Sequence, residues 1–207
     1  MDRRIWIIFL TVFIDLLGFG ILIPILPTFA QNELAMNETL IGLTVGIFSL
    51  MQFIFNPLWG RLSDIYGRKP ILIFGLSGNV FSYIITGLVL GGVLKSIPLL
   101  LISRALAGFF SANIGAAMAY ISDVTPPKDR SKGMGLIGAA FGLGFVFGPF
   151  IGGIMAKRFG YDFPTYFSAG LSFLALLLTF FFVTESLPKE LRGNKTMGGF
   201  NLKSGWR

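Results

Sequence analysis

Long uncharged stretches dominate the hydrophobic pattern of this chain. Four of them contain no Asp, Glu, Lys or Arg, namely residues 39–60, 70–94, 133–156 and 163–184. Two more, residues 5–30 and 97–122, each contain a single charge, Asp15 and Arg104 respectively. A helix needs about 20 apolar residues to cross the hydrocarbon core of a bilayer, whereas soluble helices average about 11–12 residues. The pattern therefore predicts six membrane-spanning helices.

The composition supports this interpretation. Charged residues make up 13% of the chain, about half of the ~25% that is usual in soluble domains. The 27 glycines and 23 phenylalanines suit helices packed within a membrane. We expect an all-α membrane protein in which residues 1–184 form one transmembrane domain and residues 185–207 form a polar cytoplasmic linker or tail.

The basic residues predict the orientation in the membrane. If the N-terminus is cytoplasmic, Lys95, Lys157 and Arg158 lie in outer loops, Arg104 lies within a span, and the rest of the 17 Lys and Arg lie on the inner side. This asymmetry follows the positive-inside rule and places both termini in the cytoplasm. We expect a multi-pass protein of the inner (plasma) membrane. Orientation accounts for the net charge of +7, so nucleic acid is not indicated as a partner.

The first hydrophobic run resembles a signal peptide only at its basic start. It is too long, it contains Asp15, Pro24 and Pro27, and no A-x-A site follows it. We interpret it as a retained first helix. The sequence has no Cys and no His, so neither a metal site nor another cofactor is expected. No GxxxxGK[ST] motif is present, which argues against ATP-driven transport, and nothing in the sequence indicates an enzyme.

The connection between the second and third spans, from Gly60 to Lys69, reads GRLSDIYGRK. Glycines at Gly60 and Gly67 allow a tight reversal at the membrane surface. Asp64 can face a helix N-terminus, whose dipole favours an anion, and Arg68 and Lys69 would anchor the cytoplasmic side. An ordinary basic loop is the alternative, but the arrangement G-x-L-x-D-x-x-G-R-K resembles the signature loop of the major facilitator superfamily. The resemblance implies a loop that latches the cytoplasmic side closed and unlatches during alternating access.

Three more segments carry the same resemblance. Leu17-Gly18 with Pro24-Ile25-Leu26-Pro27 resembles the first-helix motif of the twelve-helix drug:proton antiporters, and residues 144–153 match the fifth-helix motif G-x-x-x-G-P-x-x-G-G in full. Residues 104–108 resemble the fourth-helix arginine motif, although Ala107 stands where Gln is common. Tetracycline-resistance-type exporters look most similar. The resemblance, from about Trp6 to Glu185, implies an N-terminal half built as an inverted three-plus-three repeat.

The fifth-helix motif also has a direct physical meaning. Gly144, Gly148 and Gly152 recur every four residues, and this spacing lets another backbone approach closely. Pro149 breaks one helical hydrogen bond and permits a bend, and Gly153 completes the motif. Plain helix packing and a seal on the outer side are both compatible with this pattern. The resemblance implies that this stripe, like the loop at Asp64, works against helices of a second half that this chain does not contain.

Asp15 and Arg104 are the charges expected to carry the chemistry. A charge at mid-bilayer costs about 2.5–3.5 kcal/mol, so intramembrane ionisable groups usually face a cavity or a partner. From the rise of 1.5 Å per residue, the two lie within about one helical turn of the same depth. We hypothesise that both face a central cavity, with Asp15 as the proton-titrating carboxylate. Arg104 would hold the polar network of the bundle or tune Asp15; a purely structural donor to buried carbonyls is the alternative.

Other polar and aromatic groups are candidates for supporting roles. Asp123 ends the fourth span on the same side as Arg68, and an ion pair between them would brace the latch. Gln52 and Asn113, like Asn56 and Asn79, lie within spans, where hydrogen bonds to substrate or to neighbouring helices are both plausible. Four phenylalanines suit a hydrophobic substrate cavity, although lipid-facing Phe is common: Phe109, Phe110, Phe141 and Phe145.

The sequence as a whole predicts a secondary transporter in the lipid bilayer that exports small amphipathic compounds in exchange for protons. A facilitator that imports a sugar or organic anion is the alternative, and an inactive truncated half-carrier is another. Because members of the resembled family usually have twelve helices, either two copies pair as a homodimer or the second half is missing from a truncated or partial sequence. The reading frame after Arg207 would distinguish these cases.

Overall fold

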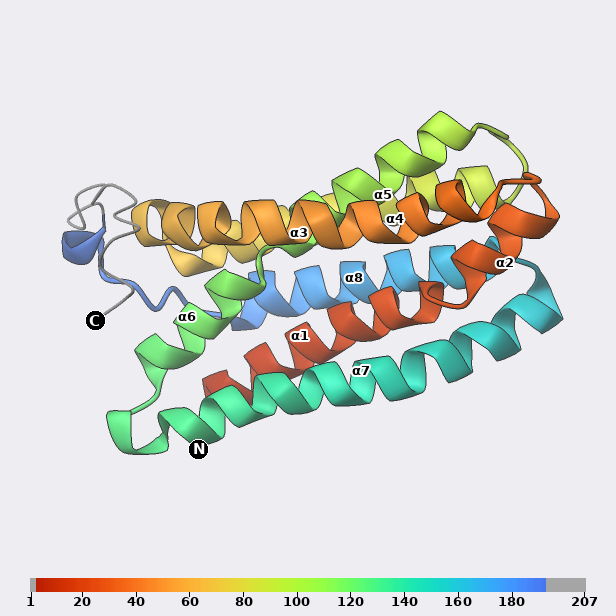
Figure 1. Ribbon diagram of the computed structural model, residues 1–207. Coiled ribbons are helices and arrows are strands. Elements are labelled where there is room, and N and C mark those ends of the chain that lie inside the picture. Colours follow the sequence, from red (N-terminus) through yellow and green to blue (C-terminus); the bar gives the residue numbers. More distant parts are fainter. Residues whose placement is uncertain (1–2, 193–207) are drawn as a thin grey trace, which may run out of the picture.

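The protein is a bundle of long α-helices that run side by side (Figure 1). The computed structural model describes residues 3–192. The bounds of the α-helices are α1 Arg3–Leu22, α2 Ile25–Asn32, α3 Glu38–Tyr66, α4 Arg68–Leu90, α5 Ile97–Ser111, α6 Ile114–Val124, α7 Arg130–Phe159 and α8 Phe163–Phe182. Two short 3-10 helices, η1 Pro127–Asp129 and η2 Lys189–Leu191, complete the described part. Residues 193–207 of the expected tail lie outside the described residues.

The predicted all-α fold with six membrane-competent helices is confirmed. The candidate spans are Arg3–Asn32, Glu38–Tyr66, Arg68–Leu90, Ile97–Val124, Pro127–Phe159 and Phe163–Phe182. The start of α1, the α3–α4 junction and the α6–α7 connection lie at one end of the bundle, and the α4–α5 and α7–α8 connections lie at the other (Figure 1). Such an alternation is what six antiparallel crossings require.

Two of the six spans are broken, which the hydrophobic pattern did not predict. Pro24 ends α1, because proline lacks the N–H that the helical ladder needs, and the chain resumes as α2 at Ile25. The fourth span breaks between Ser111 and Ile114, without a proline, at the buried residues Ala112 and Asn113. The breaks fall in the first span of each three-span unit, as expected for an inverted repeat with discontinuous helices.

The connection expected from Gly60 to Lys69 is far shorter in the structure, which corrects the sequence analysis. α3 continues as a helix through Tyr66, and only Gly67 separates it from α4. Gly67 has φ 104°, a conformation that side chains with a Cβ rarely adopt. Gly60 lies inside α3 with open space around it, so it makes no turn. The reversal depends on one glycine instead of two.

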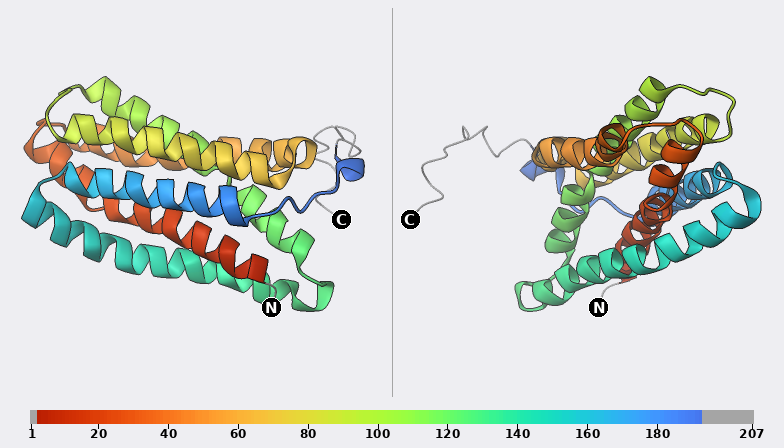
Figure 2. Two further views of the ribbon diagram at one scale, coloured as in Figure 1. Left: turned by 180° about the vertical axis from the view of Figure 1, so that it is seen from behind. Right: turned by 45° about the vertical axis from the view of Figure 1, so that its right-hand side comes forward.

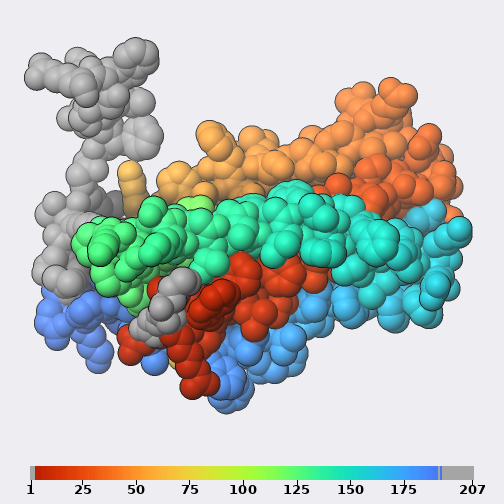
Figure 3. All heavy atoms as spheres, turned by 90° about the horizontal axis from the view of Figure 1, so that it is seen from below, coloured from red at the N-terminus to blue at the C-terminus, as the bar shows by residue number. Residues whose placement is uncertain are grey.

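The helices pack so that α1 is at the centre of one group. α1 contacts both α7 and α8, α4 packs against α8 and α5, and α3 packs against α5. Figure 2 shows α1, α7 and α8 lying together beside the group of α3, α4 and α5. In the space-filling view, α7 runs along one face next to α1 (Figure 3). The buried residues form a core cluster toward each end of α1 and a smaller third cluster of Ile14, Leu76 and Ala175.

The glycine stripe of α7 makes a very close backbone contact with α1. A Cβ added to Gly148 would lie 2.6 Å from Gly20 Cα and 2.8 Å from Ile21 N, both on α1. Gly144 and Gly152 likewise face the backbone of α1, whereas Gly153 has open space. The stripe was expected to work against a second half of the protein. Its described partner is instead α1, since glycine on both helices lets the two backbones touch.

Candidate functional site

A cavity of about 280 Å³ opens between α1, α3, α6 and α7, with one residue from the end of α5. It lies around the middle of these spans, and most of its wall is apolar or aromatic. Its lining residues are Asp15, Leu16, Phe19, Ile23, Val45, Phe48, Ser49, Gln52, Ser111, Ile114, Phe141 and Phe145. A mostly apolar wall with a few convergent polar groups is typical of small-molecule sites. This cavity is the candidate substrate site.

The Asp15 carboxylate is the polar centre of this cavity, and two buried side chains hold it. Asn79 Nδ2 on α4 donates to both carboxylate oxygens at 3.1 and 3.2 Å, and Ser172 Oγ on α8 donates to Oδ1 at 3.0 Å. Ser111 Oγ donates in turn to Asn79 Oδ1 at 3.0 Å. The carboxylate thus joins α1, α4 and α8 directly and α5 through Asn79.

Sequence reasoning found only part of this network. It noted Asn79 as a polar residue within a span but did not connect it with Asp15, and it missed Ser172. The signal for Ser172 was weak: Ser168, Ser172 and Thr179 share one face of α8 by helical spacing, and all three are buried. Such a stripe indicates that the face is buried without indicating which helix it meets.

Of the other uncharged residues expected to line a cavity, three line this one and three lie elsewhere in the bundle. Gln52 lines the cavity and donates to the Ser111 carbonyl at 3.3 Å, and Phe141 and Phe145 line it as well. Asn113 does not: it is 5% exposed and packs against Gly75 of α4. Phe109 and Phe110 also lie elsewhere, in an aromatic group with Phe55, Trp59 and Phe74.

Arg104 lies outside the cavity lining, which differs from the expectation that it and Asp15 face one cavity. It is 1% exposed, and its guanidinium carbon lies 5.2 Å from the centre of the Phe48 ring. Phe48 itself lines the cavity, so this ring separates the arginine from it. A cation above an aromatic face is stabilised by the ring quadrupole, most strongly in a dry site. Among the described residues, Arg104 Nε and Nη1 have no hydrogen-bond partner.

The second feature is an ionic cluster where α3 meets α4, here called the α3–α4 cluster: Asp64, Arg68, Asp123, Glu185 and Arg192. Arg68 is 5% exposed and sits at its centre. Its Nη2 lies 2.6 Å from Asp64 Oδ1 and its Nε lies 3.1 Å from Asp123 Oδ2. The expected ion pair between Arg68 and Asp123 is therefore present, and it connects the α3–α4 junction to α6.

Glu185 completes the cluster by capping α4. Its carboxylate accepts from Arg68 N at 2.9 Å and from Lys69 N at 3.3 Å, which satisfies two amides that a helix start leaves unpaired. Arg192 Nη2 lies 3.5 Å from the same carboxylate. We expected Asp64 at this helix N-terminus; the structure places Glu185 there, and Asp64 binds the Arg68 side chain. Motif spacing does not show this contact, because 117 residues separate Glu185 from Arg68.

Lys69 acts as an anchor of a different kind. Its Nζ donates to the Phe180 carbonyl at 2.8 Å and lies 5.7 Å from the centre of the Phe180 ring. The carbonyls in the last turn of a helix lack partners within that helix, so Lys69 supplies one for α8. The two basic residues after Gly67 thus fasten α4 to α6 and α8.

Gly67 is expected to tolerate no side chain. A Cβ there would lie 2.9 Å from Glu185 Cδ, and the positive φ adds strain. We expect Gly67→Ala to reduce the free energy of unfolding by about 1–3 kcal/mol, measured by thermal unfolding in detergent. Gly60→Ala is the matched control, since Gly60 lies within α3 with open space and alanine favours a helix interior. Equal stability of the two variants would contradict the conclusion that the reversal between α3 and α4 requires glycine at position 67.

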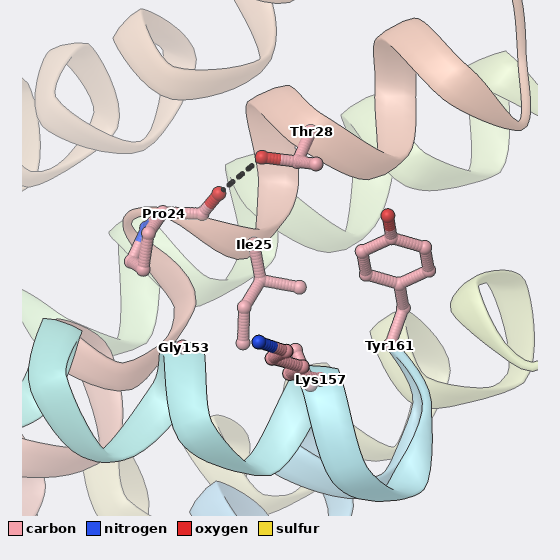
Figure 4. A pocket seen from close by; sticks show the side chains of 7 residues that line it. Pro24, Ile25, Thr28, Gly153, Lys157 and Tyr161 are labelled. Atoms are coloured by element: carbon pink, nitrogen blue, oxygen red, sulfur yellow. Dashed lines mark hydrogen bonds between the residues drawn. The ribbon is translucent and has the colours of Figure 1, made fainter.

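A separate pocket of about 330 Å³ lies at the other end of the bundle, where α2 meets the end of α7 (Figure 4). Lys157 and Tyr161 line it opposite Pro24, Ile25 and Thr28. The Thr28 hydroxyl donates to the Pro24 carbonyl at 2.9 Å. The break between α1 and α2 thus shapes the surface here. Of the candidate site residues, Gly153 of the fifth-helix motif lines this pocket.

The chain belongs to the Major Facilitator Superfamily, whose family model matches residues 8–207. It is 35% identical to the tetracycline resistance protein, class H, of Pasteurella multocida over 199 residues, covering 95% of this chain and 48% of that protein. It is also 35% identical to multidrug resistance protein 2 of Bacillus subtilis over 193 residues, covering 92% of this chain and 46% of that protein.

A similar solved structure is that of the human organic anion transporter MFSD10 (TETRAN). The TM-score is 0.79 at 30% identity, and the match covers 96% of this chain and 51% of that one. The chain spans about half the length of the curated relatives it matches. The resemblance to tetracycline-resistance-type exporters that the motifs indicated is thereby confirmed.

Proposed function

We propose that this chain forms one half of a secondary transporter that exports small amphipathic compounds in exchange for protons. The observation that carries the proposal is the Asp15 carboxylate, which lies on the wall of a largely apolar cavity within a membrane-spanning bundle. A charge at such a depth costs about 2.5–3.5 kcal/mol. Gain or loss of a proton at Asp15 therefore changes how well the cavity holds an amphipathic or cationic molecule, which is the basis of exchange.

In this proposal both termini and the α3–α4 cluster face the cytoplasm across the inner (plasma) membrane. The distribution of Lys and Arg supports that orientation. The cluster joins α3, α4, α6 and the segment after α8 through Arg68 and Glu185. It keeps this end of the bundle in one arrangement, and its ion pairs separate or re-form as the carrier alternates between its two open states.

The cavity wall also indicates the partner that the proposal requires. Asp15 lies on a wall formed by α1, α3, α6 and α7, with Ser111 from the end of α5. We propose that a second six-helix bundle completes it, supplied by a further segment of the polypeptide or by a second copy of this chain. Native mass measurement in detergent distinguishes a dimer from a monomer, and the reading frame after Arg207 identifies a further segment.

Replacing Asp15 by asparagine is the direct test of proton coupling. Asn keeps the size of the side chain and cannot titrate, so we expect Asp15→Asn to lose efflux driven by a pH gradient. Exchange of labelled for unlabelled substrate without a gradient is expected to persist. Efflux is measured in everted membrane vesicles that contain the protein in its full reading frame.

Asp129→Asn is the matched control for this test. Asp129 is an exposed carboxylate that pairs with Lys132 at 2.9 Å near the start of α7, and we expect wild-type efflux from this variant. If Asp15→Asn also retains full gradient-driven efflux, Asp15 has no part in coupling and the proposal fails.

An organic anion carrier is the second candidate, because a structural neighbour is named as one. The cavity lining argues against it for this half of the protein: it contains the Asp15 carboxylate and, among the described lining residues, no Lys or Arg. Competition of cationic against anionic substrates for transport distinguishes the two. An inactive half-carrier, the remaining alternative, predicts that expression changes neither drug tolerance nor substrate accumulation.

A further inference from the structure

A second, much smaller cavity touches Asp15 from the other side. It measures about 10 Å³ and is lined by Thr11, Val12, Asp15, Leu16, Leu72, Leu76, Asn113, Ile114 and Ala117. On α1, the larger cavity reaches from Asp15 toward Ile23, whereas the small one reaches toward Thr11. Asp15 thus stands between two cavities, one toward each end of the bundle.

Thr11 is the unusual residue in this cavity. It is 2% exposed, and its hydroxyl has no hydrogen-bond partner among the described residues. Five other buried hydroxyls in the described spans donate to the carbonyl four residues earlier, namely those of Thr44, Ser82, Thr86, Ser168 and Thr179. The Tyr83 hydroxyl also has no described partner, but Tyr83 does not line this cavity. A buried hydroxyl without a partner loses its hydrogen bonds to water with nothing in exchange, so a partner for Thr11 inside the cavity is favoured.

The size and polarity of the cavity select that partner. About 10–15 Å³ of such volume holds one water molecule, provided that two to four polar groups surround it. Thr11 and Asp15 are four residues apart on α1 and therefore lie one above the other on the same face. The Asn113 side chain, which has no role in the larger cavity, lines this one as a third polar group.

We propose that this cavity binds a single water molecule, held between the Thr11 hydroxyl and the Asp15 carboxylate. The water accepts a hydrogen bond from Thr11 and donates one to Asp15. If Asp15 carries the coupled proton, which rests on the function proposed above, the water is its exchange partner on the side of the termini. When Asp15 is protonated, its carboxyl instead donates to the water, and its proton passes to that water as the water gives one of its own protons to solvent water, so the bound water is regenerated.

Infrared difference spectroscopy tests the water site on the full chain in lipid. Spectra of the protonated minus the deprotonated protein are recorded in H₂¹⁶O and in H₂¹⁸O. A water bound to Asp15 gives an O–H stretching band that shifts with the oxygen isotope. We expect the band in the wild type and in Thr11→Ser, and its loss in Thr11→Val and in Thr11→Ala.

Thr179→Val is the matched control, because the Thr179 hydroxyl is equally buried but bonded to the Ala175 carbonyl; its band is expected to remain. Absence of an isotope-sensitive band in the wild type, or its persistence in both Thr11→Val and Thr11→Ala, overturns the water site. A spectral change on replacing choline by Na⁺ at constant pH overturns it as well, since the site would then hold a cation. Efflux by Asp15→Asn decides the proposed function separately, whichever result the spectra give.

Discussion

Replacing Gly148 by valine is expected to abolish the folded six-helix bundle. The new Cβ would lie 2.6 Å from Gly20 Cα and 2.8 Å from Ile21 N, and these backbone atoms cannot move aside as a flexible side chain can. Separating α1 from α7 to make room would also disturb the buried surroundings of Asp15. Overpacking a close contact costs about 1–3 kcal/mol and occasionally more, and we expect the upper end or beyond.

The natural control lies five residues away in the same motif. Gly153 has open space around its Cα, so Gly153→Val is expected to fold and to melt within a few degrees of the wild type. Thermal unfolding in detergent, with size-exclusion chromatography to detect aggregates, measures both variants. A well-folded Gly148→Val variant would show that α1 and α7 are not in contact as described.

Arg68→Ala is expected to have the second largest effect on stability. It leaves the carboxylates of Asp64 and Asp123 without their shared cation. Removing one partner of a buried ion pair costs about 3–5 kcal/mol. The two carboxylates are 32% and 27% exposed, and solvent lowers the expected loss to about 2–3 kcal/mol.

Two further variants show whether this loss arises from the cluster. Lys132→Ala removes an exposed ion pair with Asp129, and such pairs contribute less than about 1 kcal/mol. Arg68→Lys keeps the charge but lacks the planar fork that reaches both acids, and we expect an intermediate stability. Unfolding of all three variants is followed by circular dichroism at several detergent concentrations. Equal losses for Arg68→Ala and Lys132→Ala would contradict a central role for Arg68.

Sequence patterns predicted the spans well because lipid imposes a simple requirement. Every stretch without charges had to become a helix, since a membrane offers no water to backbone groups. The two breaks at Pro24 and Asn113 were not predicted. Pro24 was visible in the sequence, but proline within a span is compatible with a continuous kinked helix. Asn113 gave no backbone signal, and its packing on Gly75 of α4 depends on the tertiary fold.

The sequence predicted the charged residues of the candidate site but not the uncharged side chains that bind them. Asp15 stood out because a charge in a span is rare, and the structure places it on a cavity wall. Its donors Asn79 and Ser172 come from α4 and α8, and no local spacing connects three helices so far apart in the chain. Arg104 was equally prominent in the sequence. It lies over the Phe48 ring, and an aromatic partner of this kind cannot be found by searching the sequence for opposite charges.

The capping of α4 by Glu185 has a consequence for biosynthesis. α4 is the third span to leave the ribosome, yet the anion that pairs with its first amides follows the sixth. Until residue 185 has been made, the amides of Arg68 and Lys69 lack that partner. The hydrogen bonds from these amides to Glu185 can therefore form only after the sixth span has been made. In a nascent chain that stalls before this point, the N-terminus of α4 lacks its Glu185 cap.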